Sequence, residues 1–563
     1  MRASTRLTAA ASLTAAIALL ASACSGGTTP TNQTSAEPGA SGSAPAAATE
    51  VTVRGCTPEN PLIPTNTNEV CGGNVLDAIT AKLVHYNADT AAPENDIAEA
   101  IDTTDSITFT VKLKQGYKFH DGTEVKAKNF VDAWNWGAYG PNGQLNGYFF
   151  EPIEGYDDLQ CGTAKNADGE EEVNCDKAAP KTDKMTGLSV VDDYTFTIKT
   201  SSPTSNLPVR LGYTAFAPQP DAFFADSDAK KETFAKAPIG AGPYQLVEKS
   251  DTQMVLQKFA DYSGSNPGSV DKITFRIYND TNAAYNDVVS NNLDLTDVIP
   301  SDMLVGDQWQ ADLPDRNGSR ETGIIQVLTF SPIDPNLKKQ DIRRAIMMGF
   351  DRELITKQVF NGARTPASGW VSPVVDGYKA GACPDCTFNP EEAKKLYDAA
   401  GGYQGTMPIG VNGDGGHQVW AEAFCNQLKN NLGMDCAVQS TPDFATLRKG
   451  INARELEGLY RGGWQMDYPS IENFLTPIYA TGASSNDGDY SNPKFDDLLK
   501  QAAAAPSNDE ANALYQQAES ILGQDLPSIP LWYQASQFGW STKIKSVKMT
   551  PFSTWDFSSV ELA

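Results

Sequence analysis

The pattern of hydrophobic and polar positions along the chain changes between two periods, one typical of strands and one typical of helices. Residues 107–113 alternate with a period of two, which predicts a strand with one buried face, and residues 194–199 repeat this pattern. Residues 126–139 carry large apolar side chains at helical spacing and predict a helix. Its expected buried face consists of Phe130, Val131, Trp134 and Ala138.

Further helices are expected in the second half of the chain. They are residues 341–350, capped by Asp341, a helix that starts from Asp351, residues 390–400 and residues 508–522. Residues 157–185 are polar, rich in Asp and Glu and bracketed by cysteines, which predicts a surface insertion. The sequence shows no internal repeat, and the irregular order of strands and helices favours an α/β fold.

The first residues indicate export. Arg2 and Arg6 precede an apolar run over residues 7–23, which ends in small residues before Cys24. This is the pattern of a secretory signal over residues 1–23 joined to a lipoprotein cleavage site, with Cys24 acylated. A membrane anchor is the alternative, but about 17 apolar residues is at the short limit for a bilayer span. Residues 24–49, rich in Ser, Gly, Thr, Ala and Pro, then form a flexible tether, and the globular part lies outside the cytoplasmic membrane.

Composition narrows the class of partner. Beyond the tether, about 510 residues remain, enough for a large core and at least two lobes. The chain contains 70 acidic and 44 basic residues, a formal net charge of −26. This charge argues against nucleic acid, which needs clustered Lys and Arg. It also argues against attachment to anionic lipid through the protein surface, so the acyl chain on Cys24 is the expected anchor.

Nine cysteines fit an exported protein, because eight remain when Cys24 is set aside. An even number in an exported chain favours disulfides. Pairing by proximity in the sequence predicts four of them: Cys56 with Cys71, Cys161 with Cys175, Cys383 with Cys386, and Cys425 with Cys436.

The pair Cys383 and Cys386 has the C-x-x-C spacing of redox motifs and of half a zinc site. A zinc site needs two more ligands, and the sequence has no second C-x-x-C and no suitably spaced pair among its three histidines, His85, His120 and His417. A thioredoxin-like motif should open a helix after a strand, whereas this pair lies between a glycine and the start of the predicted helix 390–400. We therefore expect a small structural disulfide loop.

Motifs for catalysis are missing from the sequence. H-E-x-x-H, G-x-S-x-G and the P-loop G-K-[ST] do not occur, and no histidine is spaced for metal binding. No catalytic residue, metal site or cofactor is therefore assigned, and an enzyme is not expected.

Residues 460–469 carry the most informative charges in the chain, because Arg461 and Asp467 stand alone among aromatic residues and glycines. If this stretch is extended, a separation of six puts both side chains on one face. They are then at most about 20 Å apart, at ~3.3 Å per residue. A short peptide carries an ammonium and a carboxylate at separations within that limit. The alternative is an ordinary strand whose charges face water.

Several blocks, taken in order, resemble the oligopeptide-binding proteins of ABC importers, a branch of the large extracellular solute-binding family. Residues 113–134 look like the hairpin and helix with the pattern F-x-D-G-x-x-x-x-A-x-D-F-V-x-A-W. Residues 238–244 resemble a G-T-G-P-Y turn, with Ala241 in place of the threonine, and residues 291–296 resemble S-G-E-I-D but lack the glycine. The remaining blocks are residues 343–352, similar to V-R-x-A-x-x-x-x-I-D-R, residues 463–469 and residues 529–533.

The resemblance implies an α/β fold of two lobes with a ligand cleft between them, as in periplasmic binding proteins, and an extra domain on the first lobe. By analogy, residues 50–80, 189–275 and 530–563 form the first lobe. The extra domain covers residues 81–188 and the second lobe covers residues 276–529. Binding of ligand would close the lobes by a hinge motion.

The resemblance also implies roles for residues. Asp467 holds the ammonium of a peptide, Arg461 contacts a carbonyl or carboxylate oxygen, and Gly463 to Gln465 offer backbone groups as in strand addition. The loop 71–74 contributes further backbone contacts from the first lobe. The remaining candidate ligand-binding residues are Trp464, Tyr468, Gly72 and Gly73, although aromatic residues in such a frame more often pack a core.

The function expected from these features is that of a lipid-anchored binding component of a peptide ABC importer. Its partners would be short peptides, the permease subunits and, through Cys24, the membrane, and the protein would be a monomer. The same fold with another cargo, such as a nickel chelate, an oligosaccharide or haem, remains open. So do a peptide receptor without a transport role and an exported enzyme.

Overall fold

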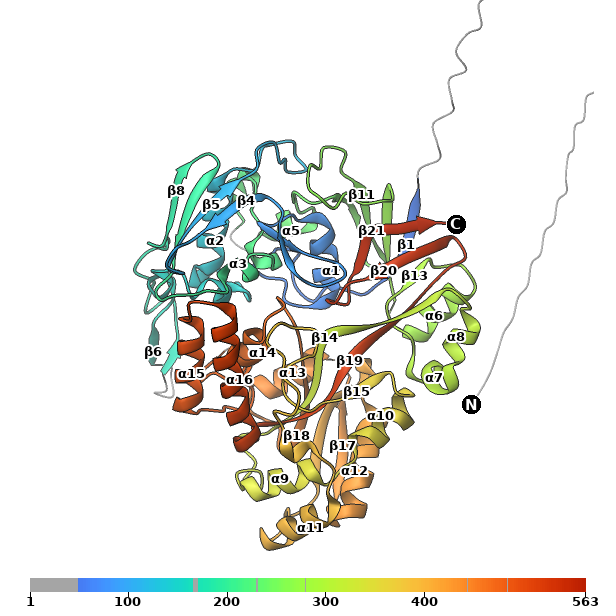
Figure 1. The fold of residues 1–563 in the computed structure, drawn as a ribbon. Coiled ribbons are helices and arrows are strands. Elements are labelled where there is room, and N and C mark those ends of the chain that lie inside the picture. Colours follow the sequence, from blue (N-terminus) through green and yellow to red (C-terminus); the bar gives the residue numbers. More distant parts are fainter. Residues whose placement is uncertain (1–48, 166–170, 229–230, 279, 443, 484) are drawn as a thin grey trace, which may run out of the picture. The chain divides into compact units, whose positions relative to one another are not determined.

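The structure is a computed structural model that describes residues 49–165, 171–228, 231–278, 280–442, 444–483 and 485–563 (Figure 1). The expected signal sequence, the acylated Cys24 and nearly all of the tether lie outside the described residues. Residues 48–563 form one compact unit. Among the helices of the described part, none is long and apolar enough to cross a bilayer.

An eleven-stranded sheet is the largest element, and two long antiparallel strands lie at its centre, β14 (Asn317–Phe330) and β19 (Ser528–Trp540). On one side of this pair the order is β10 (Tyr244–Lys249), β11 (Gln253–Lys258), β12 (Lys272–Ile277), β1 (Glu50–Gly55) and β13 (Leu295–Thr296). On the other side lie β18 (Leu459–Gln465), β16 (Met407–Asn412) and β17 (Cys436–Thr441), while β15 (Arg364–Pro366) pairs with β19 off this path. Strands β14 and β19 therefore join two groups of strands that come from distant parts of the sequence.

A separate four-stranded sheet contains both strands expected from the alternating pattern. Its order is β4 (Ala98–Asp102), β5 (Thr108–Leu113), β9 (Thr195–Lys199) and β8 (Leu188–Asp192). Helix α2 (Ala127–Ala138) lies against β8 and β9 with its four predicted residues buried, so that prediction is confirmed. The remaining strands form three hairpins, β2 (Val84–Tyr86) with β3 (Pro93–Asn95), β6 (Thr163–Lys165) with β7 (Glu171–Val173), and β20 (Ile544–Met549) with β21 (Trp555–Leu562).

The longer helices agree with the sequence except at one cap. Asp351 caps α10 as expected, since its carboxylate accepts the Leu354 N–H at 3.0 Å. Asp341 is not a cap, because α9 begins one residue earlier and Asp341 lies in its first turn, where a carboxylate also favours the helix dipole. The longer helices are α1 (Val70–Ile79), α6 (Thr281–Val289), α9 (Gln340–Met348), α10 (Arg352–Phe360), α11 (Pro390–Ala399), α12 (Gln418–Leu432), α13 (Phe444–Asn452), α14 (Glu472–Tyr479), α15 (Pro493–Ala503) and α16 (Asn508–Asp525).

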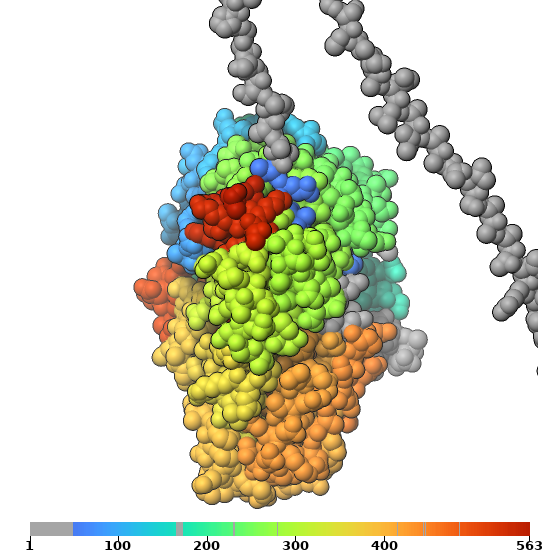
Figure 2. Space-filling model, turned by 90° about the vertical axis from the view of Figure 1, so that its right-hand side faces the viewer, coloured from blue at the N-terminus to red at the C-terminus, as the bar shows by residue number. Residues whose placement is uncertain are grey.

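Three large hydrophobic clusters divide the interior. One gathers residues of the range 325–533, a second residues of the range 51–79 with 244–275 and 538–560, and a third residues of the range 81–216. The third cluster continues past residue 188, where the extra domain was expected to end, because β9 and Phe216 belong to it. Figure 2 shows the C-terminal strands (red) beside the first strand (blue), and the Ser269 side chain donates to the Phe557 carbonyl at 2.9 Å.

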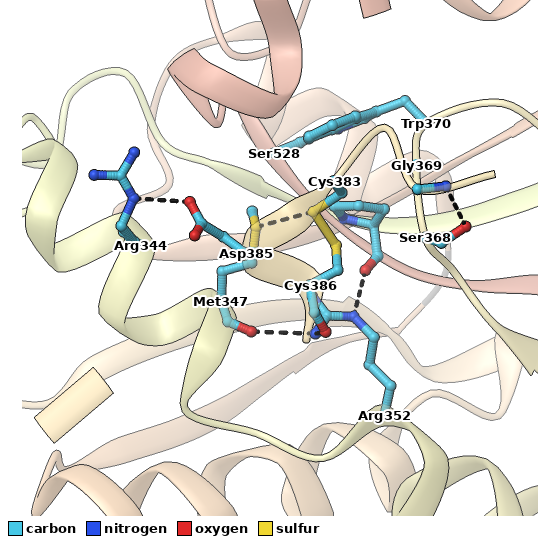
Figure 3. Close-up of a disulfide and its surroundings, with 12 residues drawn as sticks. Arg344, Met347, Arg352, Ser368, Gly369, Trp370, Cys383, Asp385, Cys386 and Ser528 are labelled. Carbon is cyan, nitrogen blue, oxygen red and sulfur yellow. Dashed lines mark hydrogen bonds and ion pairs between the residues drawn. A yellow bond between two sulfur atoms is a disulfide. The ribbon is translucent and has the colours of Figure 1, made fainter. Parts of the chain in front are cut away.

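All four predicted disulfides are present, which confirms the pairing by proximity. The Cys383–Cys386 loop packs on α9 and α10, and Figure 3 shows Arg344, Met347 and Arg352 around it. The Arg344 Nε donates to Asp385 at 2.7 Å, and the buried Arg352 donates to the carbonyl oxygens of Cys386 at 2.8 Å and Met347 at 3.1 Å. Because the loop is held by backbone contacts, it is a structural element, as expected.

The turn of residues 238–244 joins the C-terminal end of helix α1 to the backbone at His120. The Gly242 N–H donates to the Ile79 carbonyl at 2.9 Å, and the His120 N–H donates to the Gly240 carbonyl at 2.9 Å. A Cβ added at Gly240 would lie 1.9 Å from the Ile79 carbonyl oxygen. Only glycine therefore fits where the turn meets the end of α1.

We predict that Gly240→Ala destabilises the protein by about 2–3 kcal/mol. The added Cβ would collide with the Ile79 backbone, which cannot move aside as a flexible side chain could. Urea unfolding monitored by tryptophan fluorescence measures the change. Gly410→Ala is the control, since a Cβ there meets only ordinary contacts of 3.4 Å or more, and its effect should stay within about 0.5 kcal/mol. Equal midpoints for the two variants would contradict the proposed close approach.

Candidate ligand-binding site

A cavity of about 310 Å³ lies where α1, the end of β18, the β2 hairpin and the C-terminal strands meet. Asp467, Gln465 and Gly73, three of the candidate residues, line it. Two tyrosines, Tyr86 and Tyr213, add aromatic walls. The turn between β20 and β21 closes one side, because the Phe552 ring stacks on Tyr86 at 4.8 Å between centroids.

The buried side chain of Asn473 positions Asp467 by binding both its backbone N–H and its carboxylate. The Asp467 N–H donates to the Asn473 Oδ1 at 2.8 Å, and the Asn473 Nδ2 donates to the Asp467 Oδ2 at 2.9 Å. The Trp464 Nε1 donates to the same Oδ1 at 3.0 Å, so the strand end and α14 are held together. Within the described residues, no lysine or arginine lies within 4.0 Å of the Asp467 carboxylate.

The neighbouring carboxylate, Glu472, does have a cationic partner. It is 2% exposed, and the Arg210 Nη2 lies 3.3 Å from its Oε2. The hydroxyl of Tyr468 and the amide of Asn206 also donate to this oxygen. Glu472 therefore has a counter-charge inside the protein, whereas Asp467, five residues earlier in the chain, has none within ion-pair distance among the described residues.

The environment of Asp467 disfavours its charge. Burial raises the pKa of Asp467 from 3.8 to about 7, although hydrogen bonds from Asn473 and Tyr213 lower it, and the charge of Glu472 adds to the rise. The Asp467 side chain is partly exposed and lines the cavity. A cation placed in the cavity would reverse the effect, because an opposite charge favours the ionised form.

The strand before Asp467 has an open edge. The Met466 N–H donates to the Gly323 carbonyl at 2.8 Å, which marks this pair as hydrogen-bonded in the ladder of β18 with β14. Because such pairs alternate in antiparallel ladders, the backbone groups of Gly463 and Gln465 point away from β14. Strand β16 pairs with β18 only at Leu459 and Tyr460, so among the described strands none covers those groups.

Arg461 lies on the same strand, outside the lining of the cavity. Its guanidinium stacks over the Phe444 ring at 5.3 Å from the centroid, and it lies near two further basic groups. Burial lowers the pKa of His417 to about 3, and the charges of Arg461 and Arg364 lower it further. Burial lowers the pKa of Arg364 to about 10. This part of the strand is thus a region of positive potential.

The other candidates have mainly structural contacts. Tyr468 is buried in the third hydrophobic cluster, 6.4 Å from the Phe149 ring, and Trp464 packs against the first cluster. Neither lines the cavity.

The prediction of a loop at residues 71–74 was wrong, because they form the first turn of α1. The Gly72 N–H donates to Glu69 Oε1 at 3.0 Å and the Gly73 N–H donates to the Glu69 carbonyl at 2.9 Å, so neither is available to a ligand.

Sequence reasoning missed Tyr86, Tyr213, Asn473 and Phe552. Three of these lie more than 80 residues from Asp467 in the sequence, and only the fold brings them together. Asn473 had a local signal, since it follows Asp467 by six residues at the start of a helix, where a polar side chain commonly serves backbone N–H groups.

The profile for bacterial extracellular solute-binding proteins, family 5 (middle part), matches residues 92–486. The match covers more than half of the chain, and the chain therefore belongs to this family of solute-binding proteins, as the sequence motifs implied.

Three curated relatives are similar over most of their length. The oligopeptide-binding protein OppA of Bacillus subtilis is 24% identical over 506 residues, covering 87% of this chain and 88% of that protein. The periplasmic murein peptide-binding protein MppA of Escherichia coli is 27% identical over 440 residues, covering 76% and 78%. Heme-binding protein A of Haemophilus influenzae is 25% identical over 506 residues, covering 85% and 86%.

Solved structures share the fold. The structure of the Escherichia coli murein tripeptide-binding protein MppA matches with a TM-score of 0.77 at 22% identity, over 92% of this chain and 99% of that chain. This likeness confirms the expected fold class, an α/β fold of the two-lobed periplasmic-binding type.

We predict that Asp467→Asn stabilises the ligand-free protein at high pH. The pKa of about 7 in the folded state lies above the ordinary 3.8, so Asp467 destabilises the fold progressively as pH rises from about 4 to about 7. The variant should therefore melt about 1–2 °C higher than the unchanged chain at pH 8, with no gain at pH 4.

Differential scanning calorimetry of both proteins at pH 4, 6 and 8 makes the measurement. Asp102→Asn, which removes an exposed carboxylate of β4, is the control and should give no pH-dependent difference. A gain for Asp467→Asn that is the same at all three values would refute the raised pKa.

Proposed function

We propose that this protein is the non-catalytic binding component of a peptide ABC importer and captures short peptides with a free amino terminus. The observation that carries the proposal is Asp467, a carboxylate on the wall of a cavity with no cation beside it in the described structure. A peptide ammonium would supply the missing counter-charge. The relatives whose names state peptide binding support the same class of ligand.

The open edge of β18 gives the peptide backbone a place to bind. The outward backbone groups of Gly463 and Gln465 can pair with an extended ligand, and such pairing does not depend on side chains. A Cβ on Gly463 would lie 2.9 Å from the Ile325 carbonyl oxygen, which explains the glycine at this position. Gln465 is held in place because its Nε2 donates to the Phe552 carbonyl at 2.8 Å.

We further propose that the ligand is enclosed by a hinge motion of two lobes about β14 and β19. The pairing of these strands is interrupted between Glu321 and Ile325, where Gly323 lies. Contacts across the expected lobes, such as the ion pair of Arg210 with Glu472, would form on closure. The lobe boundaries remain those expected from the sequence, apart from an extra domain that reaches about residue 216.

The remaining parts of the proposal concern location and partners. A signal over residues 1–23 and acylation of Cys24 would anchor the protein to the outer face of the cytoplasmic membrane. The permease would receive the peptide there, ATP would be hydrolysed by other subunits, and the protein would act as a monomer. Labelling with radioactive palmitate, lost in Cys24→Ala, tests the anchor.

One alternative has a specific observation behind it. Heme-binding protein A is about as similar to this chain as the peptide-binding relatives are, so the family match alone does not fix the cargo. Asp467 favours a ligand with an amine over haem, whose ionisable groups are carboxylates. An oligosaccharide, a nickel chelate and a receptor role without transport are weaker alternatives.

We predict that a pool of random tetrapeptides raises the melting temperature of residues 48–563, and that the N-acetylated pool does not. A ligand that binds only the folded state stabilises it, and acetylation removes the ammonium that Asp467 would bind. The protein is first unfolded and refolded without reductant to release any bound ligand. Asp467→Ala should lower the affinity for a free-amine peptide at least tenfold, with folding intact, whereas Asp102→Asn should not.

An equal shift with both pools, or an affinity of Asp467→Ala within threefold of the unchanged chain, would remove Asp467 from the proposed role. No shift with either pool would count against peptides as a class and favour another solute.

A second prediction concerns the positive region of β18. Arg461 and Arg364 would favour a carboxylate at the far end of the ligand, so peptides amidated at the C-terminus should bind at least fivefold more weakly than free acids. Arg461→Met should abolish that difference, as measured by calorimetric titration. Lys357→Met, an exposed change on α10, is the control. A difference that persists in Arg461→Met would refute the role of Arg461.

A further inference from the structure

Beyond Asp467, the charged residues that line the cavity are mainly acidic. From Asp467 the cavity extends along α1 to the β2 hairpin and to β21. Its lining includes five carboxylates, Glu69, Asp77, Asp96, Asp467 and Asp556, against one lysine, Lys82, and one histidine, His85. Excess negative charge therefore lines the whole length of the space, beyond what a single peptide ammonium would use.

Local contacts satisfy several of these groups. Both Glu69 oxygens accept the Gly72 N–H at 3.0 Å, and Asp556 accepts from Ser558. Asp77 pairs with Lys82 at 2.8 Å, and His85 pairs with Glu94 at 3.0 Å. The lysine and the histidine thus both have carboxylate partners of their own.

Asp96 is the exception. It is 4% exposed, and its Oδ1 accepts the Tyr117 hydroxyl at 2.9 Å. Among the described residues, its Oδ2 accepts no hydrogen bond, and no Lys, Arg or His nitrogen lies within 4.0 Å of the carboxylate. Burial raises the pKa of Asp96, while the Tyr117 hydroxyl and the more distant charges of His85, Lys82 and Lys114 lower it. Asp96 lines the cavity. A buried carboxylate in this state is a place where a cationic group gains more than it would at the surface.

The carboxylates form a series along the cavity. Tyr86 lies near both Asp467 and Asp77, since burial and then the charges of these two residues raise the pKa of its hydroxyl. Tyr262 lies near both Asp96 and Asp77, since burial and their charges raise its pKa in the same way. Asp467, Asp77 and Asp96 therefore line one cavity together with the rings of Tyr86 and Tyr262.

We infer that this region selects peptides whose first residue carries a basic side chain, with Asp96 receiving the side-chain cation, the charge of Asp77 adding to the attraction, and Asp467 binding the ammonium. This inference rests on the proposed function. A lysine or arginine has an apolar stem that can lie along Tyr86 and Tyr262 and a charged end that reaches the carboxylates. An acidic first residue would meet Asp77 and Asp96 and is rejected.

The experiment compares tetrapeptides that differ only in the first residue, followed by three alanines. Calorimetric titration of residues 48–563 at 150 mM salt uses lysine, norleucine and glutamate at that position. Norleucine keeps most of the apolar stem and lacks the charge. We expect the lysine peptide to bind at least fivefold more tightly than the norleucine peptide, and the glutamate peptide to bind most weakly.

Two variants test the assigned residues. Asp96→Asn and Asp77→Asn should each reduce the ratio of lysine to norleucine affinity at least threefold, while binding of the norleucine peptide, which reports folding, is retained. Asp102→Asn removes one exposed negative charge outside the cavity and should leave the ratio unchanged. If Asp96→Asn does not fold, Asp77→Asn decides.

A lysine to norleucine ratio below fivefold in the unchanged protein would overturn the inference. So would a ratio reduced less than threefold in every variant that folds, or one reduced equally by Asp102→Asn. In each of these cases free-amine peptides still bind, and the proposed function stands. If none of the three peptides binds, the proposed function itself fails.

Discussion

The pairing of β14 with β19 is the interaction on which the rest of the structure depends. These two strands lie in the middle of the eleven-stranded sheet, and they join the strands on one side of the sheet to those on the other. They are separated by about 200 residues in the sequence, so their pairing brings the C-terminal segment back beside the first strand. The pairing shifts register at two places, between Glu321 and Ile325 and between Gln326 and Val327. The first of them contains Gly323, whose carbonyl accepts the Met466 N–H, and so lies next to the cavity-lining Asp467.

Two neighbouring carboxylates show how the protein separates structural charge from available charge. Glu472 is buried with Arg210, so its charge is neutralised where α14 meets the segment around residue 206. Asp467 receives only neutral hydrogen-bond donors, which orient it without neutralising it. A buried ion pair contributes little net stability compared with apolar packing. A buried carboxylate that lacks a cation destabilises the empty site, and an opposite charge in the cavity would remove that cost.

Local patterns correctly predicted two strands and five helices and left the other elements unassigned, and the reason is physical. The period of two in β5 and β9 and the helical spacing in α2 follow from which side chains are buried, and burial depends on near neighbours. The helix cap at Asp341 and the loop at residues 71–74 were misjudged, because both depend on the residue just before the helix. Glu69 begins α1 by capping Gly72, a role that Ser, Thr, Asp and Asn fill more often. The cavity walls Tyr86, Tyr213 and Phe552 could not be predicted, since they meet only through long-range contacts.

The family motifs contain both residues that hold the fold together and residues that line the cavity, and only the structure distinguishes the two. Arg343 donates to the carbonyl of Asp525 at 2.8 Å, and Arg352 donates to three separate backbone carbonyls, so two of the three arginines of the 343–352 block hold segments together through backbone carbonyls. Gly240 permits a close backbone approach, and Trp464 and Tyr468 pack cores. From the same set of motifs, Pro243, Tyr244, Gln465, Met466 and Asp467 line the cavity, and Asp467 is the one carboxylate among these five residues. Asp77 and Asp96 also line the cavity but lie outside the motifs, so no motif match could have pointed to them.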